Sequence, residues 1–171
     1  AIPEMDLKEV TTVTSFFFFF KEIQLSSPIF ISSMTAGNDR GLEINRRLAS
    51  LSERHQILMG VGSQRRELSD VEASNEWANI RKSNPKALLL GNLGLAQLIA
   101  TPLDQIQKLV ENLQAIGFFI HLNPLQEALQ SEGTPNFKGG LAALEKLVKN
   151  CSVPVVVKET GSGMSISTLK R

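Results

Sequence analysis

Residues able to bind or react with a polar ligand follow five separate apolar stretches of this sequence. Each group contains hydroxyl, amide or charged side chains, which form hydrogen bonds with phosphate and other polar groups. In a parallel sheet the carboxyl ends of the strands meet at one edge, so these groups are predicted to form one composite site. Any single group would more often be a turn or a helix cap, and it is their number that favours function. The groups are 32–37 (SSMTAG), 60–65 (GVGSQR), 91–94 (GNLG), 121–127 (HLNPLQE) and 158–161 (KETG).

Two cations and a histidine are the strongest individual candidates. Arg65 could hold a phosphate through two parallel hydrogen bonds, although a plain surface arginine is an equally good interpretation. Lys158 follows three consecutive valines, so its ammonium group is expected to leave an apolar strand and point into the site. His121 closes another apolar stretch, and taken alone it is better interpreted as a structural, hydrogen-bonded histidine.

The segment that follows His121 adds Asn123, Gln126 and Glu127. One carboxylate is too little for a metal site built from protein alone, but it suits Mg²⁺ held jointly by water and a substrate phosphate. Cys151 has no histidine or acid motif beside it, which favours a buried space-filling role over that of a nucleophile. The glycines of the five groups lack the spacing of a dinucleotide-binding fingerprint or a P-loop, so a Rossmann assignment is unsupported.

The five apolar stretches are predicted to be fully buried strands of a parallel sheet. They start about thirty residues apart, and the intervals between them carry helical patterns, which is typical of repeated βα units. The predicted strands are 28–32, 57–61, 87–90, 118–122 and 153–157.

The clearest helix is predicted after the third strand, with Thr101 as its cap, Pro102 at its first position and Gly117 at its end. A run of five phenylalanines, 16–20, fits no period; we interpret it as a strand or plug over one end of the sheet, with an aromatic ligand platform as the alternative. Apolar stripes mark this helix (Leu103, Ile106, Val110, Leu113, Ile116), a second before the last strand (Leu141, Leu144, Leu147, Val148) and a weaker one after the first (Leu42, Leu48, Leu51).

The composition is that of an ordinary globular domain, with 171 residues of which 42% are hydrophobic and 20% charged. A formal net charge of +1 provides no field that would attract nucleic acid or an anionic membrane. The single cysteine cannot form an internal disulfide, and the sequence shows no signal peptide or long apolar span, so a cytoplasmic location is expected. The chain opens at Ala1 without a methionine, which suggests missing sequence.

Together these motifs resemble the type 2 isopentenyl-diphosphate isomerases, which are FMN-dependent enzymes of isoprenoid biosynthesis with a (β/α)₈ TIM-barrel fold. The HLNPLQE segment is the most specific, whereas Asn-Leu-Gly alone would carry little weight. The resemblance implies an α/β chain, 1–171, that forms one partial FMN-binding barrel domain with roughly the first five βα units. The matching segments are 28–37, 60–65, 91–94, 121–127 and 154–164.

The resemblance also implies roles for individual residues. Gln126, His121 and Asn123 would be catalytic, with Gln126 over the reacting carbons, and Glu127 would bind Mg²⁺. A fixed cation at Lys158 would stabilise the negative charge of reduced flavin. Ser33, Met34 and Thr35 would pack against the flavin, Ser63 and Asn92 would bond its ring edge, Lys158 would face its N1 and O2 side, and Ser63, Gln64, Arg65 and Gln126 would meet the substrate, with Arg65 and His121 near its diphosphate.

The implied reaction interconverts isopentenyl diphosphate and dimethylallyl diphosphate by moving a double bond, without net redox. Reduced FMN would serve as the acid and base, with NADPH as the reductant. The loops agree, because they supply no Asp/Glu pair and no Cys-Glu pair placed to protonate an alkene. The implied partners are the diphosphate substrate and further copies of the chain, with no nucleic acid and no membrane.

The sequence departs from the family in several places. Family members are about twice as long. Their N-terminal Arg-Lys substrate segment and their later glycine-rich loops for the FMN phosphate are absent here, which favours the interpretation that this sequence is part of a longer protein. The segment 116–118 and the five-phenylalanine run also differ from the usual family pattern. Two alternatives stay open, namely an FMN-dependent hydroxy-acid oxidase or dehydrogenase barrel and a non-catalytic, anion-binding fragment.

Overall fold

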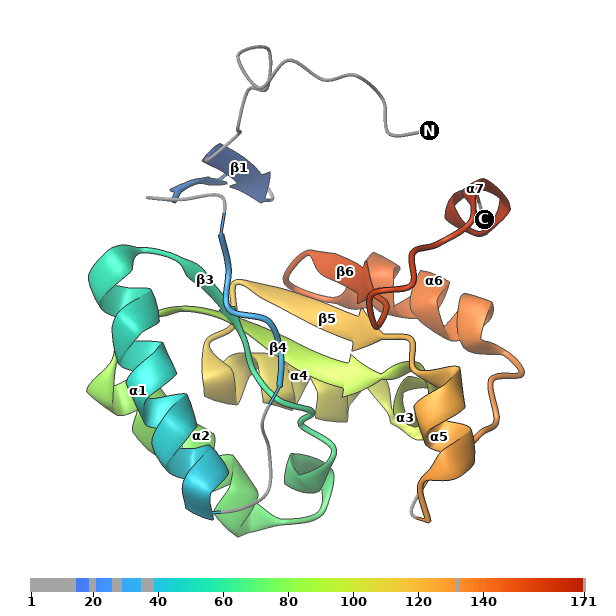
Figure 1. Cartoon of the computed structure of the whole chain (residues 1–171), viewed down its shortest axis with the longest axis horizontal. Helices are drawn as coiled ribbons and strands as arrows, with labels where there is room; N and C mark the ends of the chain where they lie inside the picture. The colour runs from blue at the N-terminus through green and yellow to red at the C-terminus, as the bar shows by residue number, and fades with distance from the viewer. Residues whose placement is uncertain (1–14, 19–20, 26–28, 35–38, 132, 171) are drawn as a thin grey trace.

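The protein is an α/β structure built on a four-stranded parallel sheet, with helices packed against it (Figure 1). The computed structural model describes residues 15–18, 21–25, 29–34, 39–131 and 133–170. The strands lie side by side in chain order, β3-β4-β5-β6, which is the order that successive βα units produce. Their bounds are Leu58–Gly60 for β3, Leu88–Gly94 for β4, Gly117–His121 for β5 and Val155–Lys158 for β6.

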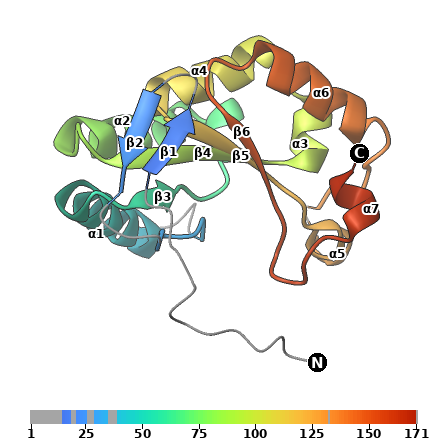
Figure 2. The ribbon, with the colours of Figure 1, turned by 90° about the horizontal axis from the view of Figure 1, so that it is seen from above.

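Helices occupy the intervals between the strands. Seen from above, α1, α2, α4 and α6 follow one another along the sheet (Figure 2). The helices are α1 (Asp39–His55), α2 (Val71–Ser83), α3 (Leu95–Ala100), α4 (Leu103–Leu113), α5 (Pro124–Leu129), α6 (Gly140–Asn150) and α7 (Ile166–Leu169), with a 3₁₀ turn, η2, at Arg66–Leu68.

The two faces of the sheet differ because side chains alternate along a strand. On one face Leu89, Leu93, Phe118 and Ile120 join the helices in a single hydrophobic core. Neighbouring residues on parallel strands point the same way, so Asn92, Phe119, His121 and Lys158 share the opposite face. This second face carries the polar residues predicted to form the site.

The first predicted strand, 28–32, is wrong in extent. Pro28 lies outside the described residues, and among 29–32 only Ile31 bridges to Met59, through hydrogen bonds of 2.8 Å to Leu58 and from Gly60. Part of the five-phenylalanine run does form a strand: β1 (Ser15–Phe18) pairs with β2 (Lys21–Gln24) as an antiparallel hairpin in a separate sheet. Residues 19 and 20 lie outside the described part of the chain.

The last predicted strand forms but is not buried. Val157 in β6 is 40% exposed and its neighbours are half-buried. Within the described residues β6 has β5 on one side and no strand on the other, so its second edge lacks cover. Of the predicted stripe on α6 only Leu147 is fully buried, whereas Leu141 and Val148 are more than half exposed.

The helix after the third strand also needs correction at both ends. Pro102 occupies the N-cap of α4, and the Thr101 hydroxyl instead donates to the carbonyl of Gln97 at 2.7 Å. The helix ends one turn earlier than predicted, with Gln114 in the left-handed conformation (φ 47°), and Gly117 begins β5.

At the amino end of the sheet, a buried arginine joins the segments that lead into β4 and β5. The Arg81 guanidinium donates to five backbone carbonyls at distances of 2.8–3.3 Å. Burial lowers the pKa of Arg81, an effect that the Glu53 charge opposes. The accepting residues are Leu113, Asn84, Pro85, Ala87 and Gln114.

None of the helices in the described part of the chain combines the length and the hydropathy needed to cross a membrane.

Candidate active site

A polar cavity of about 590 Å³ lies beyond the carboxyl ends of β3 and β5. It brings together side chains from three of the five predicted groups, 32–37, 60–65 and 121–127, because the ends of parallel strands meet at one edge of the sheet. The lining residues are Met34, Ser63, Arg65, Arg66, Ser69, Gln97, His121, Asn123, Gln126, Glu127 and Gln130.

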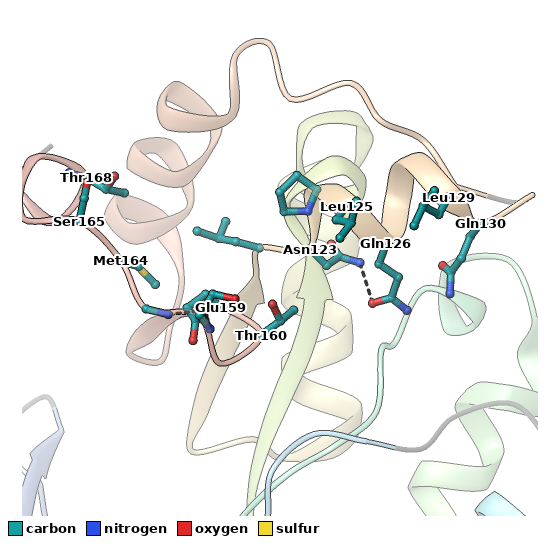
Figure 3. A pocket seen from close by; sticks show the side chains of 14 residues that line it. Asn123, Leu125, Gln126, Leu129, Gln130, Glu159, Thr160, Met164, Ser165 and Thr168 are labelled. Atoms are coloured by element: carbon teal, nitrogen blue, oxygen red, sulfur yellow. Dashed lines mark hydrogen bonds between the residues drawn. The ribbon is translucent and has the colours of Figure 1, made fainter.

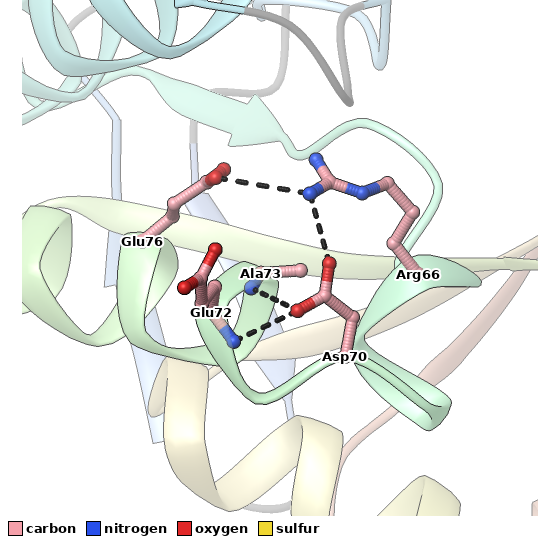
Figure 4. Close-up of polar contacts among 5 residues, drawn as sticks. All are labelled: Arg66, Asp70, Glu72, Ala73 and Glu76. Atoms are coloured by element: carbon pink, nitrogen blue, oxygen red, sulfur yellow. Dashed lines mark hydrogen bonds and ion pairs between the residues drawn. The ribbon is translucent and has the colours of Figure 1, made fainter.

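The turn that carries Ser63 and Arg65 is tied to the start of α2. Asp70 caps this helix, with one carboxylate oxygen accepting the N–H groups of Glu72 at 2.9 Å and Ala73 at 3.3 Å (Figure 4). Arg66 donates to the other oxygen at 3.0 Å, and this bond together with the two backbone donors lowers the pKa of Asp70. The turn therefore enters α2 in a defined geometry.

Gln64, predicted to meet the substrate, is fully buried instead of lining the cavity. Its backbone N–H donates to the Asn92 carbonyl at 2.8 Å, and its Oε1 accepts the Asn92 N–H at 3.0 Å. Gly91 leaves space for this contact, because a Cβ there would lie 2.5 Å from the Phe118 ring and 2.7 Å from Gln64 Oε1. Gln64 thus fixes the middle of β4 in this structure.

Asn92 lies inside β4, whereas the sequence predicted it in a loop after a strand that ended at residue 90. The small residues around it continue β4 as far as Gly94. Its Nδ2 donates to the Val61 carbonyl at 3.0 Å, and its Oδ1 lies 2.9 Å from His121 Nδ1. Asn92 therefore links the turn after β3 to the histidine at the end of β5.

His121 is half-buried at the cavity wall. Burial, followed by the nearby Lys158 charge, lowers the pKa of His121 against the attraction of Glu127. The imidazole is therefore neutral at neutral pH, with one ring nitrogen donating and the other accepting.

Asn123 and Glu127 form the acidic corner of the cavity, and each is only 5% exposed. Asn123 Nδ2 donates to Glu127 Oε1 at 3.2 Å and lies 3.5 Å from Gln126 Oε1 (Figure 3). The other Glu127 oxygen accepts the Thr134 N–H at 2.8 Å. The side-chain amide oxygen of Asn123, Oδ1, is buried and has no hydrogen-bond partner among the described residues.

Glu127 is ionised at neutral pH despite its burial. Burial alone would raise the pKa of Glu127, but hydrogen bonds from Thr134, Asn123 and Gln97 and the Arg65 charge outweigh it and lower the pKa. Among the described residues, no group of three His, Cys, Asp or Glu side chains could hold a metal ion. Glu127 could therefore contribute one carboxylate ligand to a cation that other groups also bind.

Of the residues predicted to face a flavin, Ser33 and Met34 are described and Thr35 lies outside the described residues. The Ser33 hydroxyl is buried and has no hydrogen-bond partner among the described residues. A Cβ at Gly60 would collide with this hydroxyl, so the glycine provides its space. Met34 is 82% exposed and lines the cavity.

Lys158 lies next to His121 in the strand register, outside the group that lines this cavity. Its Nζ donates to the Glu159 carbonyl at 3.2 Å. The Glu159 carboxylate accepts the N–H groups of Gly161, Ser162 and Gly163 at 2.6–2.9 Å. Burial would raise the pKa of Glu159, but these backbone bonds lower it.

A second cavity, of about 930 Å³, lies between α5 and the segment after β6. Figure 3 shows Gln126 and Gln130 on one side of it and Glu159 and Met164 on the other. Asn123, Gln126 and Gln130 line both cavities, so α5 separates the polar space from a more apolar one lined by Leu125 and Leu129.

Three residues next to the site were not predicted. Gln97 donates to the Thr134 hydroxyl at 3.2 Å, which places both beside Glu127. Glu67 contacts the buried Gln64 amide. No spacing in the sequence identifies them, because their partners in the site lie in other elements or turns of the fold.

The chain matches proteins of known name along its whole length. It is 63% identical over 171 residues to a protein of Bdellovibrio bacteriovorus, a match that covers 100% of this chain and 49% of the relative. It is 49% identical over 171 residues to a protein of Legionella pneumophila, with the same coverage, and 39% identical over 165 residues to one of Archaeoglobus fulgidus, covering 96% of this chain and 47% of the relative. These relatives are isopentenyl-diphosphate delta-isomerases.

The chain spans about half the length of the isopentenyl-diphosphate delta-isomerases that it matches. No model of a protein family matches it. The names of the relatives agree with the isomerase that the sequence motifs predicted, and they do not state a flavin requirement.

Proposed function

We propose that this chain carries the substrate-binding and catalytic residues of an FMN-dependent isopentenyl-diphosphate delta-isomerase. The observation that carries the proposal is the convergence of Arg65, His121, Asn123, Gln126 and Glu127 on one cavity, in a chain similar to enzymes of that name. The chain order of the four parallel strands, with Ile31 bridging to β3, supports placing the sheet in a (β/α)₈ barrel.

The residues present fit a flavin on the polar face of the sheet. Ser33 presents a buried hydroxyl without a partner in the described chain, and Met34 presents an exposed thioether that could pack against a flat ring. Lys158 stands on the same face and would stabilise negative charge there. Ser33, Met34, Ser63, Asn92 and Lys158 are the described residues that would hold the ring. When bound, reduced FMN would supply the acid and base for the proton transfers, with NADPH as the reductant.

The acidic corner fits Mg²⁺ shared with a diphosphate. Glu127 is ionised, faces the cavity and keeps lone pairs beyond those used by Asn123 and Thr134. A hard cation that retains water ligands needs only one or two carboxylates when phosphate oxygens complete its shell. Arg65 lines the same cavity and would add a bidentate contact to the diphosphate.

The remaining side chains would orient the hydrocarbon part of the substrate. Gln126 lies on α5 between the polar cavity and the apolar one, where it would separate the diphosphate from the alkene.

Cys151 follows α6 at the opposite, amino end of β6 and cannot reach the cavity. Glu127 is the one carboxylate in the described lining, and its lowered pKa makes it a poor acid for protonating an alkene.

The test is an isomerisation assay on the protein purified from its native gene. With FMN, NADPH and Mg²⁺ it should convert isopentenyl diphosphate into dimethylallyl diphosphate, and removal of either flavin or Mg²⁺ should stop the conversion. Q126L should lose activity, whereas Q105L, a substitution on the exposed side of α4, should retain it. Conversion by flavin-free protein would contradict the FMN requirement, and no conversion by folded, flavin-loaded protein would contradict the isomerase.

A further inference from the structure

A carboxyl group behind the cavity has no role in the proposed reaction. Glu67 lies in η2, and its Oε1 is buried without a hydrogen-bond partner among the described residues. Its Oε2 accepts a hydrogen bond of 3.3 Å from Gln64 Nε2. Neighbouring residues surround the group: α1 contributes Leu42 and Asn45, α2 contributes Ala73, Glu76 and Trp77, the turn after β3 contributes Ser63, and η2 itself contributes Arg66.

A continuous series of hydrogen bonds leads from Glu67 to the cavity. Gln64 Oε1 accepts the Asn92 N–H at 3.0 Å, and the Asn92 carbonyl accepts the Gln64 N–H at 2.8 Å. The Asn92 side chain then contacts His121 at 2.9 Å. Gln64 is 0% exposed and Asn92 is 4% exposed, so water cannot replace these bonds.

A second bond of the Asn92 side chain defines the protonation of the histidine. The Val61 carbonyl can only accept, so the Asn92 group facing it at 3.0 Å must be the NH₂. The Asn92 atom facing His121 is consequently the oxygen, which can only accept. His121 Nδ1 must therefore carry the proton, and Nε2 is left with its lone pair.

We propose that Glu67 is a positioning residue that holds the His121 imidazole in one orientation and one tautomer, acting through Gln64 and Asn92. It does so by keeping the Gln64 amide turned with its oxygen toward β4, since Gln64 Nε2 needs an acceptor on the far side. Without that acceptor the amide can turn over, and its NH₂ would then oppose the Asn92 N–H, displacing the β4 backbone that carries the Asn92 side chain and loosening its bonds to Val61 and His121. The effect on turnover rests on the proposed function, whereas the effect on the imidazole does not.

Glu67 fills this position in its neutral form. Burial raises the pKa of Glu67 to about 8; the Gln64 bond and the Arg66 charge oppose this shift, and the Glu76 charge adds to it. Oε2 accepts from Gln64, so the proton belongs on Oε1. Ionisation above this pKa keeps Oε2 as an acceptor for Gln64 but leaves a charge in a buried site beside Glu76, so the pH effect arises because the site must rearrange or admit water. We therefore expect the His121 geometry to depend on pH through Glu67.

The experiment compares the native protein with E67Q and E67A by nitrogen-15 NMR of the His121 ring, whose signals are assigned by their loss in H121Q. E67Q keeps a neutral acceptor for Gln64, and E67A removes it. At pH 7 the wild type and E67Q should show the single Nδ1-protonated tautomer, and E67A a mixture. Above pH 8 the wild type should become mixed while E67Q stays unchanged. E72Q removes an exposed charge of the same segment and should behave as the wild type.

In the activity assay, E67A should lower kcat/KM roughly tenfold and E67Q should restore it to near the wild-type value. A single tautomer in folded E67A, or the same pH response in E67Q and the wild type, would overturn the proposal. If E67A does not fold, the comparison of E67Q with the wild type across pH 8 still decides. If isomerase activity is absent altogether, the ring spectra test this proposal separately from the proposed function.

Discussion

The two ends of the parallel sheet satisfy their polar groups in opposite ways. At the amino end Arg81 is buried and donates to five backbone carbonyls. They belong to the end of α4 and to the segment between α2 and β4. At the carboxyl end the hydroxyl of Ser33 and the side-chain amide oxygen of Asn123 are buried without a partner in the described chain. His121 at this end also has its pKa lowered by burial and by a nearby cation.

The difference indicates which end stabilises the fold and which end is built for a ligand. Buried polar groups without partners cost folding free energy, and they persist where a ligand satisfies them. The amino end leaves no such role for a ligand around Arg81. We therefore assign stability to the Arg81 end and binding to the cavity at the carboxyl end.

The largest expected effect is on stability at the amino end. R81M keeps much of the aliphatic packing but leaves five carbonyls without their hydrogen-bond donor, so the free energy of unfolding should fall by about 3 kcal/mol or more. Denaturant unfolding measures this change. The exposed neighbour Lys82 provides the control, and K82M should change little. An R81M loss below about 1 kcal/mol would remove the contrast between the two ends.

At Glu127 the larger effect is expected on activity. E127Q preserves the size of the side chain but removes the charge that would bind Mg²⁺, so kcat/KM should fall by about a hundredfold. Its NH₂ group would also face one of the donors Asn123 and Thr134, so the free energy of unfolding should fall as well, by less than in R81M. A titration of activity against Mg²⁺ measures the effect, with the exposed E145Q on α6 as control. Full activity of E127Q at ordinary Mg²⁺ concentrations would exclude Glu127 as the metal ligand.

A smaller effect is expected at Arg65, which lines the cavity and is exposed. R65M should raise KM for the diphosphate about tenfold with little change in kcat, because a bidentate contact to phosphate is lost in both the ground state and the transition state. R65K, which keeps the charge but not the paired donors, should lie between the two. An unchanged KM in R65M would place the diphosphate elsewhere.

The effect of pH on stability is expected to be small per pH unit and spread over several units. The folded pKa of Glu67, about 8, exceeds its ordinary value of 4.5, so between these values the folded state holds a proton that the unfolded state has released. Stability should therefore fall as pH rises through this window, by at most about 1.4 kcal/mol per pH unit. The lowered pKa of His121 makes stability rise with pH below its ordinary value of 6.5, which is the opposite trend. The difference in unfolding free energy between wild type and E67Q isolates the Glu67 contribution, because His121 is present in both. Parallel stability curves for the two proteins would show that Glu67 is ionised in the fold.

Much of the sheet was predictable because apolar, β-branched runs define buried strands. The runs around Met59, Leu89 and Phe118 became β3, β4 and β5 within a few residues. The run before Lys158 formed a strand but not a buried one, since burial depends on neighbours that a local pattern does not specify. The stretch around Ile31 formed only one bridge for the same reason.

The cavity was predictable as a set of groups at strand ends, but its internal bonding was not. Asn92 was expected in a loop, but it lies in β4, which pairs with β5 as far as Gly94 and His121. Gln64 was expected to meet the substrate, yet the fold buries it against β4. Glu67, Gln97 and Thr134 give no sequence signal, because their roles come from contacts between separate elements. Neither the oligomeric state nor the cellular location is tested by the structure, and both stay predictions.

The most direct test of the account is a chimera in which these 171 residues replace the matching segment of the Bdellovibrio bacteriovorus isomerase. If the carboxyl-end cavity is the catalytic site, the folded chimera should bind FMN and convert isopentenyl diphosphate at a rate within about tenfold of its parent. A chimera that folds and binds FMN but has no activity, while its parent is active under the same conditions, would contradict the account.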